Sequence, residues 1–259
     1  IRNLQRHKEF EMVFENLYEF IKKDTENAII YIGGDIAHSK TDMSPELVDQ
    51  LSRLFKRLSE LCPTLLIAGN HDCNLNNPSR LDVLQPIVEN IKNENLHYLN
   101  ESRVYYVADV GFAVLEVRDN ESNLPDPATI NASTKILLYH GTVDKSQTDL
   151  GFYLPSAVKL KDFNGYDMVM LGDIHKRQSL DADNRVWYCG STIQQNHGES
   201  DDKGFLIWEI LGKKEYSVEH ISLKNPKPFK TINLTPYCGR EKDHNYNVPV
   251  ALLEGYDHV

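Results

Sequence analysis

The sequence is poor in cysteine and has no long apolar run, and these absences exclude several classes of protein. Its cysteines form no CxxC pair and have no zinc-finger spacing, so we expect reduced, packed thiols rather than a disulfide framework. No apolar run approaches the roughly 18 residues that cross a bilayer, and the opening stretch IRNLQRHKEF lacks the features of a signal peptide. We therefore predict an intracellular protein, either cytoplasmic or in the nucleoid or nucleus. The four cysteines are Cys62, Cys73, Cys189 and Cys238.

Positive charge is also scarce. The chain has 28 lysines and arginines against 38 acidic residues, which gives a formal net charge of −10. This balance argues against a protein that coats nucleic acid by bulk attraction, although a local basic patch or bound cations can still attract phosphate. The length of 259 residues is enough for one large domain with a small appendage.

Helical patterns and short apolar strands alternate in the first part of the chain. Apolar residues recur with the helical period over residues 5–23. Residues 28–32, AIIYI, predict a strand that is covered on both faces, and residues 64–68, TLLIA, predict a second one. Between them, residues 44–61 predict a helix with Ser44 as its N-cap and proline at its first position. This alternation predicts a mostly parallel sheet covered by helices.

The second part of the chain is rich in strands. After about residue 96, five apolar segments follow one another with few helical patterns between them: VYYVADVGFAVLEV, KILLYH, YDMVML, VWYCG and GFLIWEI. We therefore predict an α/β sandwich of two packed sheets with helices outside. Two prolines in NPKPF mark a linker. We place a large domain at residues 1–224 and part of a small module at residues 225–259.

Four apolar runs end in glycine next to residues that can bind metal or transfer protons. In open α/β sheets, the loops at the carboxyl ends of strands cluster at one edge and carry functional groups. Four of the ten histidines lie in these loops, which composition alone does not explain. YIGGDIAH contains Asp35 and His38, LIAGNHD contains Asn70, His71 and Asp72, LLYHG contains His140, and VMLGDIH contains Asp173 and His175.

Each of these motifs alone also has a structural explanation. A Gly-Asp pair after a strand is usually a turn or a helix cap, and His140 alone also fits a hydrogen-bonded buried histidine. Together, however, they fit a pair of cations about 3.5–4 Å apart that clamps a phosphate and lowers the pKa of a water. Oxygen and imidazole ligands suit Mn²⁺, Fe²⁺ or Zn²⁺.

The order GGDIAH, GNHD, YHG and GDIH, followed by YCGSTIQQNHGE and KGFLIWEI, resembles the calcineurin-like metallophosphoesterase superfamily. It most resembles the DNA double-strand-break repair exonuclease branch, the SbcD-like nuclease subunits, over about residues 28–210. The resemblance implies an α/β fold, namely a four-layer αββα metallophosphoesterase sandwich of two mixed sheets with helices outside. The start of a small C-terminal capping module would follow.

The resemblance also implies two divalent metal ions, Mn²⁺ by analogy with the branch, with Mg²⁺, Fe²⁺ or Zn²⁺ as alternatives. Asp35 resembles the bridging carboxylate, and His175 resembles a ligand of the second metal. By the same resemblance, the other ligands of the first metal would be Asn70, His140 and Asp173. The branch usually has histidine in place of Asp173, which makes the site here more negative. The family's first strand, which ends in Asp-X-His, is absent from the sequence, so the chain looks truncated ahead of its first residue.

Further residues resemble parts of the catalytic machinery. His71 resembles the residue that protonates the leaving oxygen, with Asp72 orienting it. His38 lies where the branch has a histidine near the scissile phosphate. Basic residues near the motifs are candidates for binding flanking phosphates, although each also fits a solvated surface charge. They are Arg80, Lys176 and Arg177.

By resemblance, then, the chain is a metal-dependent DNA exonuclease or endonuclease subunit in DNA repair or recombination. Its implied partners are DNA, an SbcC-type ATPase subunit and a second copy of itself. A phosphodiesterase or phosphatase with a small substrate is an alternative that the negative net charge favours, whereas His38 favours the nuclease. A non-catalytic scaffold with an incomplete metal site is a third reading, if the natural protein begins at Ile1.

Overall fold

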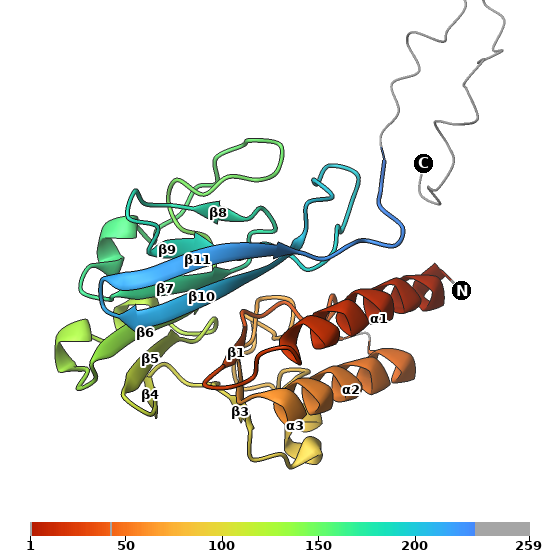
Figure 1. Cartoon of the computed structure of the whole chain (residues 1–259), viewed down its shortest axis with the longest axis horizontal. Coiled ribbons are helices and arrows are strands. Elements are labelled where there is room, and N and C mark those ends of the chain that lie inside the picture. Colours follow the sequence, from red (N-terminus) through yellow and green to blue (C-terminus); the bar gives the residue numbers. More distant parts are fainter. Residues whose placement is uncertain (1, 42, 231–259) are drawn as a thin grey trace, which may run out of the picture.

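The computed structural model describes residues 2–41 and 43–230, which form an α/β sandwich (Figure 1). The first half consists of α1 (Arg2–Ile21), β1 (Ile30–Ile32), α2 (Pro45–Leu61), β2 (Thr64–Leu66), α3 (Gln85–Ile91) and β3 (Leu96–Tyr98). The second half consists of β4 (Val104–Val107), β5 (Val110–Leu115), β6 (Thr134–His140), β7 (Met168–Gly172), β8 (Gln178–Ser179), β9 (Val186–Tyr188), β10 (Gly204–Gly212) and β11 (Glu215–Ser222). Three short 3₁₀ helices also occur: η1 (Glu121–Asn123), η2 (Pro127–Thr129) and η3 (Leu160–Phe163).

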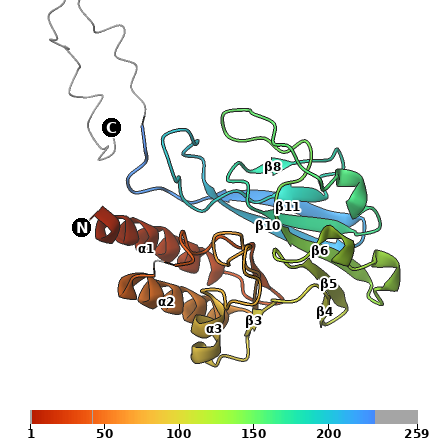
Figure 2. The ribbon, with the colours of Figure 1, turned by 180° about the vertical axis from the view of Figure 1, so that it is seen from behind.

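The α-helices cover one side of the parallel sheet β1-β2-β3, and they lie together on one side of the molecule in both views (Figures 1 and 2). Helix α2 begins as predicted, because the Ser44 Oγ accepts a hydrogen bond of 3.2 Å from the Leu47 N–H. Apolar residues of α2 at helical spacing are buried against the sheet: Leu51, Leu54, Phe55 and Leu58. The predicted helical layer over the first sheet is confirmed.

The second sheet has six strands in the order β4-β5-β6-β7-β9-β8. Strands β5, β6, β7 and β9 are parallel, and antiparallel strands β4 and β8 form its edges, so the sheet is mixed. Between the two sheets lies an apolar core, which the antiparallel hairpin β10–β11 also contacts. Among the residues of this core are Leu65, Ile67, Phe112, Val114, Leu138, Met168 and Trp208. Two sheets packed face to face confirm the predicted fold class.

Loops and the short 3₁₀ helices cover the outer face of the six-stranded sheet. Buried there are Val143, Val158, Phe163 and Tyr166. The segment between β6 and β7 contains several glycines and a proline, which disfavour a long helix. The outer layer on this side is therefore thinner than the α-helical layer on the other.

The predicted linker at residues 225–229 packs on the domain. The Phe229 N–H donates to the Gln194 Oε1 at 2.8 Å, and the centroids of the Phe229 and His197 rings lie 4.8 Å apart. Most of the predicted capping module, residues 231–259, lies outside the described residues. No helix in the described ranges is both long and apolar enough to cross a membrane.

Candidate metal centre

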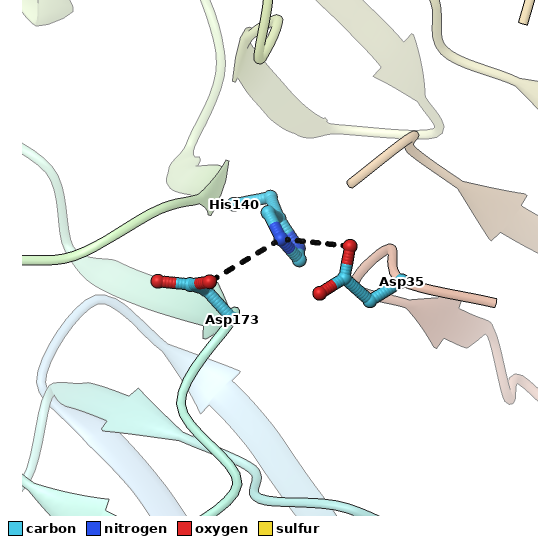
Figure 3. A group of neighbouring side chains, drawn as sticks. All are labelled: Asp35, His140 and Asp173. Carbon is cyan, nitrogen blue, oxygen red and sulfur yellow. Dashed lines mark ion pairs between the residues drawn. The ribbon is translucent and has the colours of Figure 1, made fainter. Parts of the chain in front are cut away.

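Four polar side chains converge, and they follow the carboxyl ends of two parallel strands in each sheet, β1 and β2 in one and β6 and β7 in the other. The Nε2 of His140, at the end of β6, lies 3.3 Å from the Asp35 Oδ1, 3.3 Å from the Asn70 Oδ1 and 3.8 Å from the Asp173 Oδ1. In Figure 3 the two carboxylates approach the imidazole from opposite sides. Asp35, His140 and Asp173 each offer a ligand atom, and these atoms lie within 4.8 Å of one another.

Glycines allow this close approach of backbones. A Cβ on Gly69 would overlap the Asp35 carboxylate and lie 2.6 Å from the His140 Cε1. A Cβ on Gly34 would lie 2.6 Å from the His140 Nδ1. Gly34 also has a φ of +88°, which favours glycine. The glycines of the GGD and GN motifs therefore make room for the metal-binding group.

Both carboxylate residues have backbone conformations that are uncommon outside glycine. The φ angle is +53° at Asp35 and +95° at Asp173. Such conformations persist when the surrounding structure enforces them, and they concentrate at functional sites. Thr142 stabilises one of these residues, since its Oγ1 donates to the Asp173 Oδ2 at 3.0 Å. The turns after β1 and β7 thus bring both carboxylates to the same imidazole.

The buried His140 ring is oriented by the backbone. Its Nδ1 lies 2.7 Å from the Gly33 carbonyl oxygen. Because a carbonyl only accepts, Nδ1 carries a proton and Nε2 faces the oxygens of the site. Burial lowers the pKa of His140, but the hydrogen bond and charge of Asp35 outweigh it, so that pKa is raised overall. Burial likewise raises the pKa of Asp35, yet His140 and His71 lower it below its usual value.

These donors fit a divalent cation. Ligands at about 2.0–2.2 Å from an ion are at most about 4.4 Å apart, so small side-chain movements would gather atoms that now lie within 4.8 Å. Two carboxylates, one amide oxygen and one imidazole form a mixed oxygen and nitrogen set, which suits Mn²⁺, Fe²⁺ or Zn²⁺. The hydrogen bond from His140 to the Gly33 carbonyl is typical of ligating histidines, whose second nitrogen is usually bonded to an acceptor.

His175 is not part of the group whose ligand atoms lie within 4.8 Å of one another, although the charge of Asp35 helps to raise its pKa. It has its own supporting carboxylate. Its Nδ1 lies 2.8 Å from the Glu199 Oε1, and Glu199 also pairs with the buried amine of Lys203 at 3.1 Å. The Lys203 Nζ in turn donates to the His175 carbonyl at 2.9 Å. Because Glu199 engages Nδ1, Nε2 is the ring nitrogen of His175 that remains for binding a cation. Glu199 was not among the predicted site residues, although it lies within the motif YCGSTIQQNHGE.

Glu199 is paired with His175 and Lys203, so its protonation at low pH is expected to lower the stability of the fold. Burial raises the pKa of Glu199, but its hydrogen bonds and Lys203 lower it to about 2, from an ordinary value of 4.5. Because the pKa of Glu199 is lower in the folded state than in the unfolded state, its ionised form stabilises the fold above pH 4.5 by about 3 kcal/mol. This contribution is lost as the pH falls toward 2.

We expect Glu199→Gln to lower the free energy of unfolding at pH 7 and to remove part of the acid-induced loss. Urea unfolding at several pH values measures both effects. The exposed Glu94→Gln is the matched control and should follow the parent protein. Parallel pH curves for Glu199→Gln and the parent would contradict this role.

His71 and His38 form an exposed pair at the rim of the group. Their rings stack with centroids 5.6 Å apart, and the His71 Nδ1 lies 3.0 Å from the His38 carbonyl oxygen. The His71 N–H donates to the Asp35 Oδ1 at 2.9 Å. His71 is therefore tied to both the predicted bridging carboxylate and the loop of His38.

The buried Asp72 carboxylate holds the backbone rather than the His71 ring. It accepts hydrogen bonds from the N–H groups of Gly69 at 2.8 Å, Ala37 at 2.7 Å and Ile36 at 3.2 Å. Burial raises the pKa of Asp72 to about 6 despite these donors. Asp72 was expected to orient the His71 ring. In the structure the His38 carbonyl holds that ring, and Asp72 instead joins the two loops through their backbone N–H groups.

The three predicted phosphate-binding residues differ in their surroundings. The Lys176 Nζ donates to the Gln147 Oε1 at 3.1 Å, and Arg177 forms an ion pair with Asp202 at 2.8 Å. Arg80 is exposed, and its guanidinium forms no ion pair within residues 2–41 and 43–230. Lys176 and Arg177 follow His175 directly and lie on its side of the site, with their cationic groups already engaged by neighbours.

A cavity of about 240 Å³ adjoins the metal-binding group. It shares Asn70, His140 and Asp173 with that group. Its other lining residues include three acids and no lysine or arginine: Glu116, Asp119 and Glu121. An acidic lining disfavours a second phosphate in this cavity.

All four residues of the metal-binding group lie in the part of the chain that matches a known family. A sequence profile of the calcineurin-like phosphoesterase family matches residues 7–177. An uncharacterized protein, R555, of Acanthamoeba polyphaga mimivirus is 40% identical over 247 residues, which cover 90% of this chain and 18% of that protein. The putative phosphoesterase 244L of Invertebrate iridescent virus 6 is 22% identical over 250 residues, 87% of this chain and 84% of that protein.

A cellular protein is also similar. The DNA double-strand break repair protein Mre11 of Haloferax volcanii is 26% identical over 220 residues, which cover 80% of this chain and 45% of that protein. The chain therefore spans less than a fifth of the mimivirus relative and less than half of the archaeal one.

Proposed function

Since the chain belongs to the calcineurin-like phosphoesterase family, we propose that it is a metal-dependent phosphodiesterase whose substrate is DNA. The observation that carries the proposal is the convergence of Asp35, Asn70 and Asp173 on the His140 Nε2, with the His71 backbone bonded to Asp35. The similarity to a protein named for DNA double-strand break repair supports DNA as the substrate. Binding to an ATPase partner of the SbcC type and self-association of the chain remain predictions.

In this proposal, one cation would be held by Asp35, Asn70, His140 and Asp173. Asp35 would bridge to a second cation, which His175 would also bind. When bound, the cations would supply Lewis-acid stabilisation of the phosphoryl oxygens and lower the pKa of a water. Glu199 accepts from the His175 Nδ1, as the Gly33 carbonyl does from the His140 Nδ1, so that Nε2 would be the nitrogen of each ring that binds a cation.

His71 would donate a proton to the leaving oxygen. Its Nδ1 proton is engaged by the His38 carbonyl, so the Nε2 proton of the imidazolium form is the one available for transfer. The exposed position of the ring lets it reach a bound substrate. His38 stacks on this ring and would limit its rotation.

The acidic cavity favours a second candidate function, hydrolysis of a small phosphodiester or phosphomonoester. Glu116, Asp119 and Glu121 line a space that adjoins the site and has no lysine or arginine in its lining. An uncharged substituent of a small substrate would enter it at lower electrostatic cost than a continuing phosphate backbone.

His71→Ala tests the proposed chemistry. With Mn²⁺ present, we expect the variant to hydrolyse linear DNA about 10²-fold more slowly than the parent, because the alkoxide leaving group loses its general acid. The loss on bis(4-nitrophenyl) phosphate should be much smaller, because nitrophenolate departs without being protonated. Metal binding, followed by calorimetry, should persist because the His71 side chain is not a proposed ligand. His97→Ala, at an exposed histidine on β3, is the control.

Cleavage of the nitrophenyl diester but not of DNA would favour the second candidate function. Unchanged activity of His71→Ala on both substrates would refute the role of His71. A parent protein that binds Mn²⁺ and hydrolyses neither substrate would favour the non-catalytic scaffold.

A further inference from the structure

Residues 147–153 form a short hairpin in the green connection between β6 and η3, which projects beyond β8 (Figures 1 and 2). An antiparallel bridge joins Gln147 to Tyr153, and the Thr148 N–H donates to the Phe152 carbonyl at 3.0 Å. Gly151 lies in the turn with a φ of +83°. We refer to residues 147–153 as the 147–153 hairpin.

This hairpin exposes three large apolar side chains. Leu150 is 68% exposed, Phe152 is 67% exposed and Tyr153 is 69% exposed. Single exposed apolar residues are common on protein surfaces, but a group of them marks an interaction site. The described residues contain no other run of four that holds three exposed large apolar side chains. Two of the three are aromatic.

The hairpin is fixed to the segment that follows His175. The Gln147 carbonyl accepts from the Gln178 Nε2 at 2.8 Å, and the Gln147 side chain accepts from Lys176 at 3.1 Å. Because Tyr153 lies opposite Gln147 in the bridge, it lies close to this segment as well.

A second anchor lies on the side of Glu199. The Asp149 carboxylate accepts from the Ser200 N–H at 3.2 Å and pairs with Lys203 at 3.5 Å. Lys203 is the same buried amine that bonds the His175 carbonyl. The exposed side chains are thus held in place relative to the metal centre rather than carried on a free loop.

We propose that the 147–153 hairpin is a stacking platform for the bases of single-stranded nucleic acid whose phosphodiester lies at the metal centre. This inference rests on the proposed function. Aromatic side chains stack on any base, and nearby cations attract the phosphates. The exposed Lys145 precedes the hairpin by two residues and forms no ion pair in the described part of the chain. Lys176 lies against the base of the hairpin.

The surroundings favour a nucleic acid over a protein partner. A stable protein interface buries about 800 Å² on each partner around a continuous apolar centre. The apolar side chains here lie on one narrow turn beside polar neighbours such as Asp149 and Ser200. A stacking platform needs only a few exposed rings beside basic groups. Single strands or frayed ends fit this surface, because the base faces of an intact duplex are covered by stacking.

The test compares binding of a short fluorescent oligodeoxythymidylate with hydrolysis of bis(4-nitrophenyl) phosphate. The oligonucleotide carries phosphorothioate linkages, so that binding is measured by anisotropy without cleavage. We expect the Phe152→Ala/Tyr153→Ala double variant to bind at least about 10-fold more weakly than the parent while its hydrolysis of the diester is unchanged. Phe152→Leu/Tyr153→Leu keeps the apolar character without the aromatic faces and should lose affinity similarly.

Two controls separate stacking from other effects. Leu211→Ala removes an apolar side chain that is 71% exposed on β10 and should bind as the parent does. An abasic oligonucleotide of equal length should bind the parent and the double variant equally.

Equal affinity of parent and double variant for the oligodeoxythymidylate would overturn the inference. So would full affinity in the leucine variant, or a loss of self-association with oligonucleotide binding retained. A parent that hydrolyses neither the diester nor linear DNA would overturn the proposed function alone, and the binding comparison would still decide the role of the hairpin.

Discussion

Asp35→Asn is expected to reduce Mn²⁺-dependent phosphodiester hydrolysis by about 10³-fold, because metal ions contribute several kcal/mol to transition-state stabilisation and each 1.36 kcal/mol is a factor of ten. Asp35 is the carboxylate that lies 3.3 Å from the His140 Nε2 and also accepts the His71 N–H. Asparagine keeps the size of the side chain but removes the charge that would bridge two cations.

The loss should appear in metal binding as well as in turnover. Calorimetric titration of Asp35→Asn with Mn²⁺ should show weaker binding and fewer bound ions than the parent. Asp49→Asn, at an exposed acid on helix α2 that pairs with Arg53, should match the parent in both assays. Parent-like stoichiometry and rate in Asp35→Asn would show that the cations are held elsewhere.

Asp72→Asn is expected to lower the free energy of unfolding by about 2 kcal/mol or more, since a buried donor or acceptor left unsatisfied costs about 1–3 kcal/mol. One Asp72 oxygen accepts from Ala37 and the other from Gly69 and Ile36. An amide would turn its NH₂ group toward at least one of these N–H donors. The cost arises in a side chain that is fully buried.

The same substitution should reduce activity although Asp72 does not touch the metal-binding group. Asp72 joins the loop of Asp35 and His38 to the loop of Asn70 and His71, so its loss would loosen both. Urea unfolding and Mn²⁺-dependent hydrolysis measure the two effects, with Glu94→Gln as the exposed control. If Asp72→Asn unfolds like the parent, the backbone bonds are not what holds these loops together.

The sequence alone determined where strands end and which side chains lie there. The helix beginning after Ser44, the strands that end before Asp35 and Asn70, and the strand-rich second half all follow from local patterns, because caps and periodicity act over a few residues. Local patterns did not reveal β11, which pairs with β10 across a tight turn. They also did not show that loops rather than α-helices cover the outer face of the six-stranded sheet.

Only the tertiary structure decided which groups hold the site residues in place. The His140 ring is oriented by the carbonyl of Gly33, a residue 107 positions away in the sequence. The His175 ring is held by Glu199, and the loop of Asp35 is held by Asp72. Backbone carbonyls occur at every residue, so the sequence does not distinguish the one that meets a histidine, and the pairing depends on how the sheets stack. The residue types at the strand ends thus determine the chemistry of the site, whereas packing between segments that are distant in the chain determines its geometry.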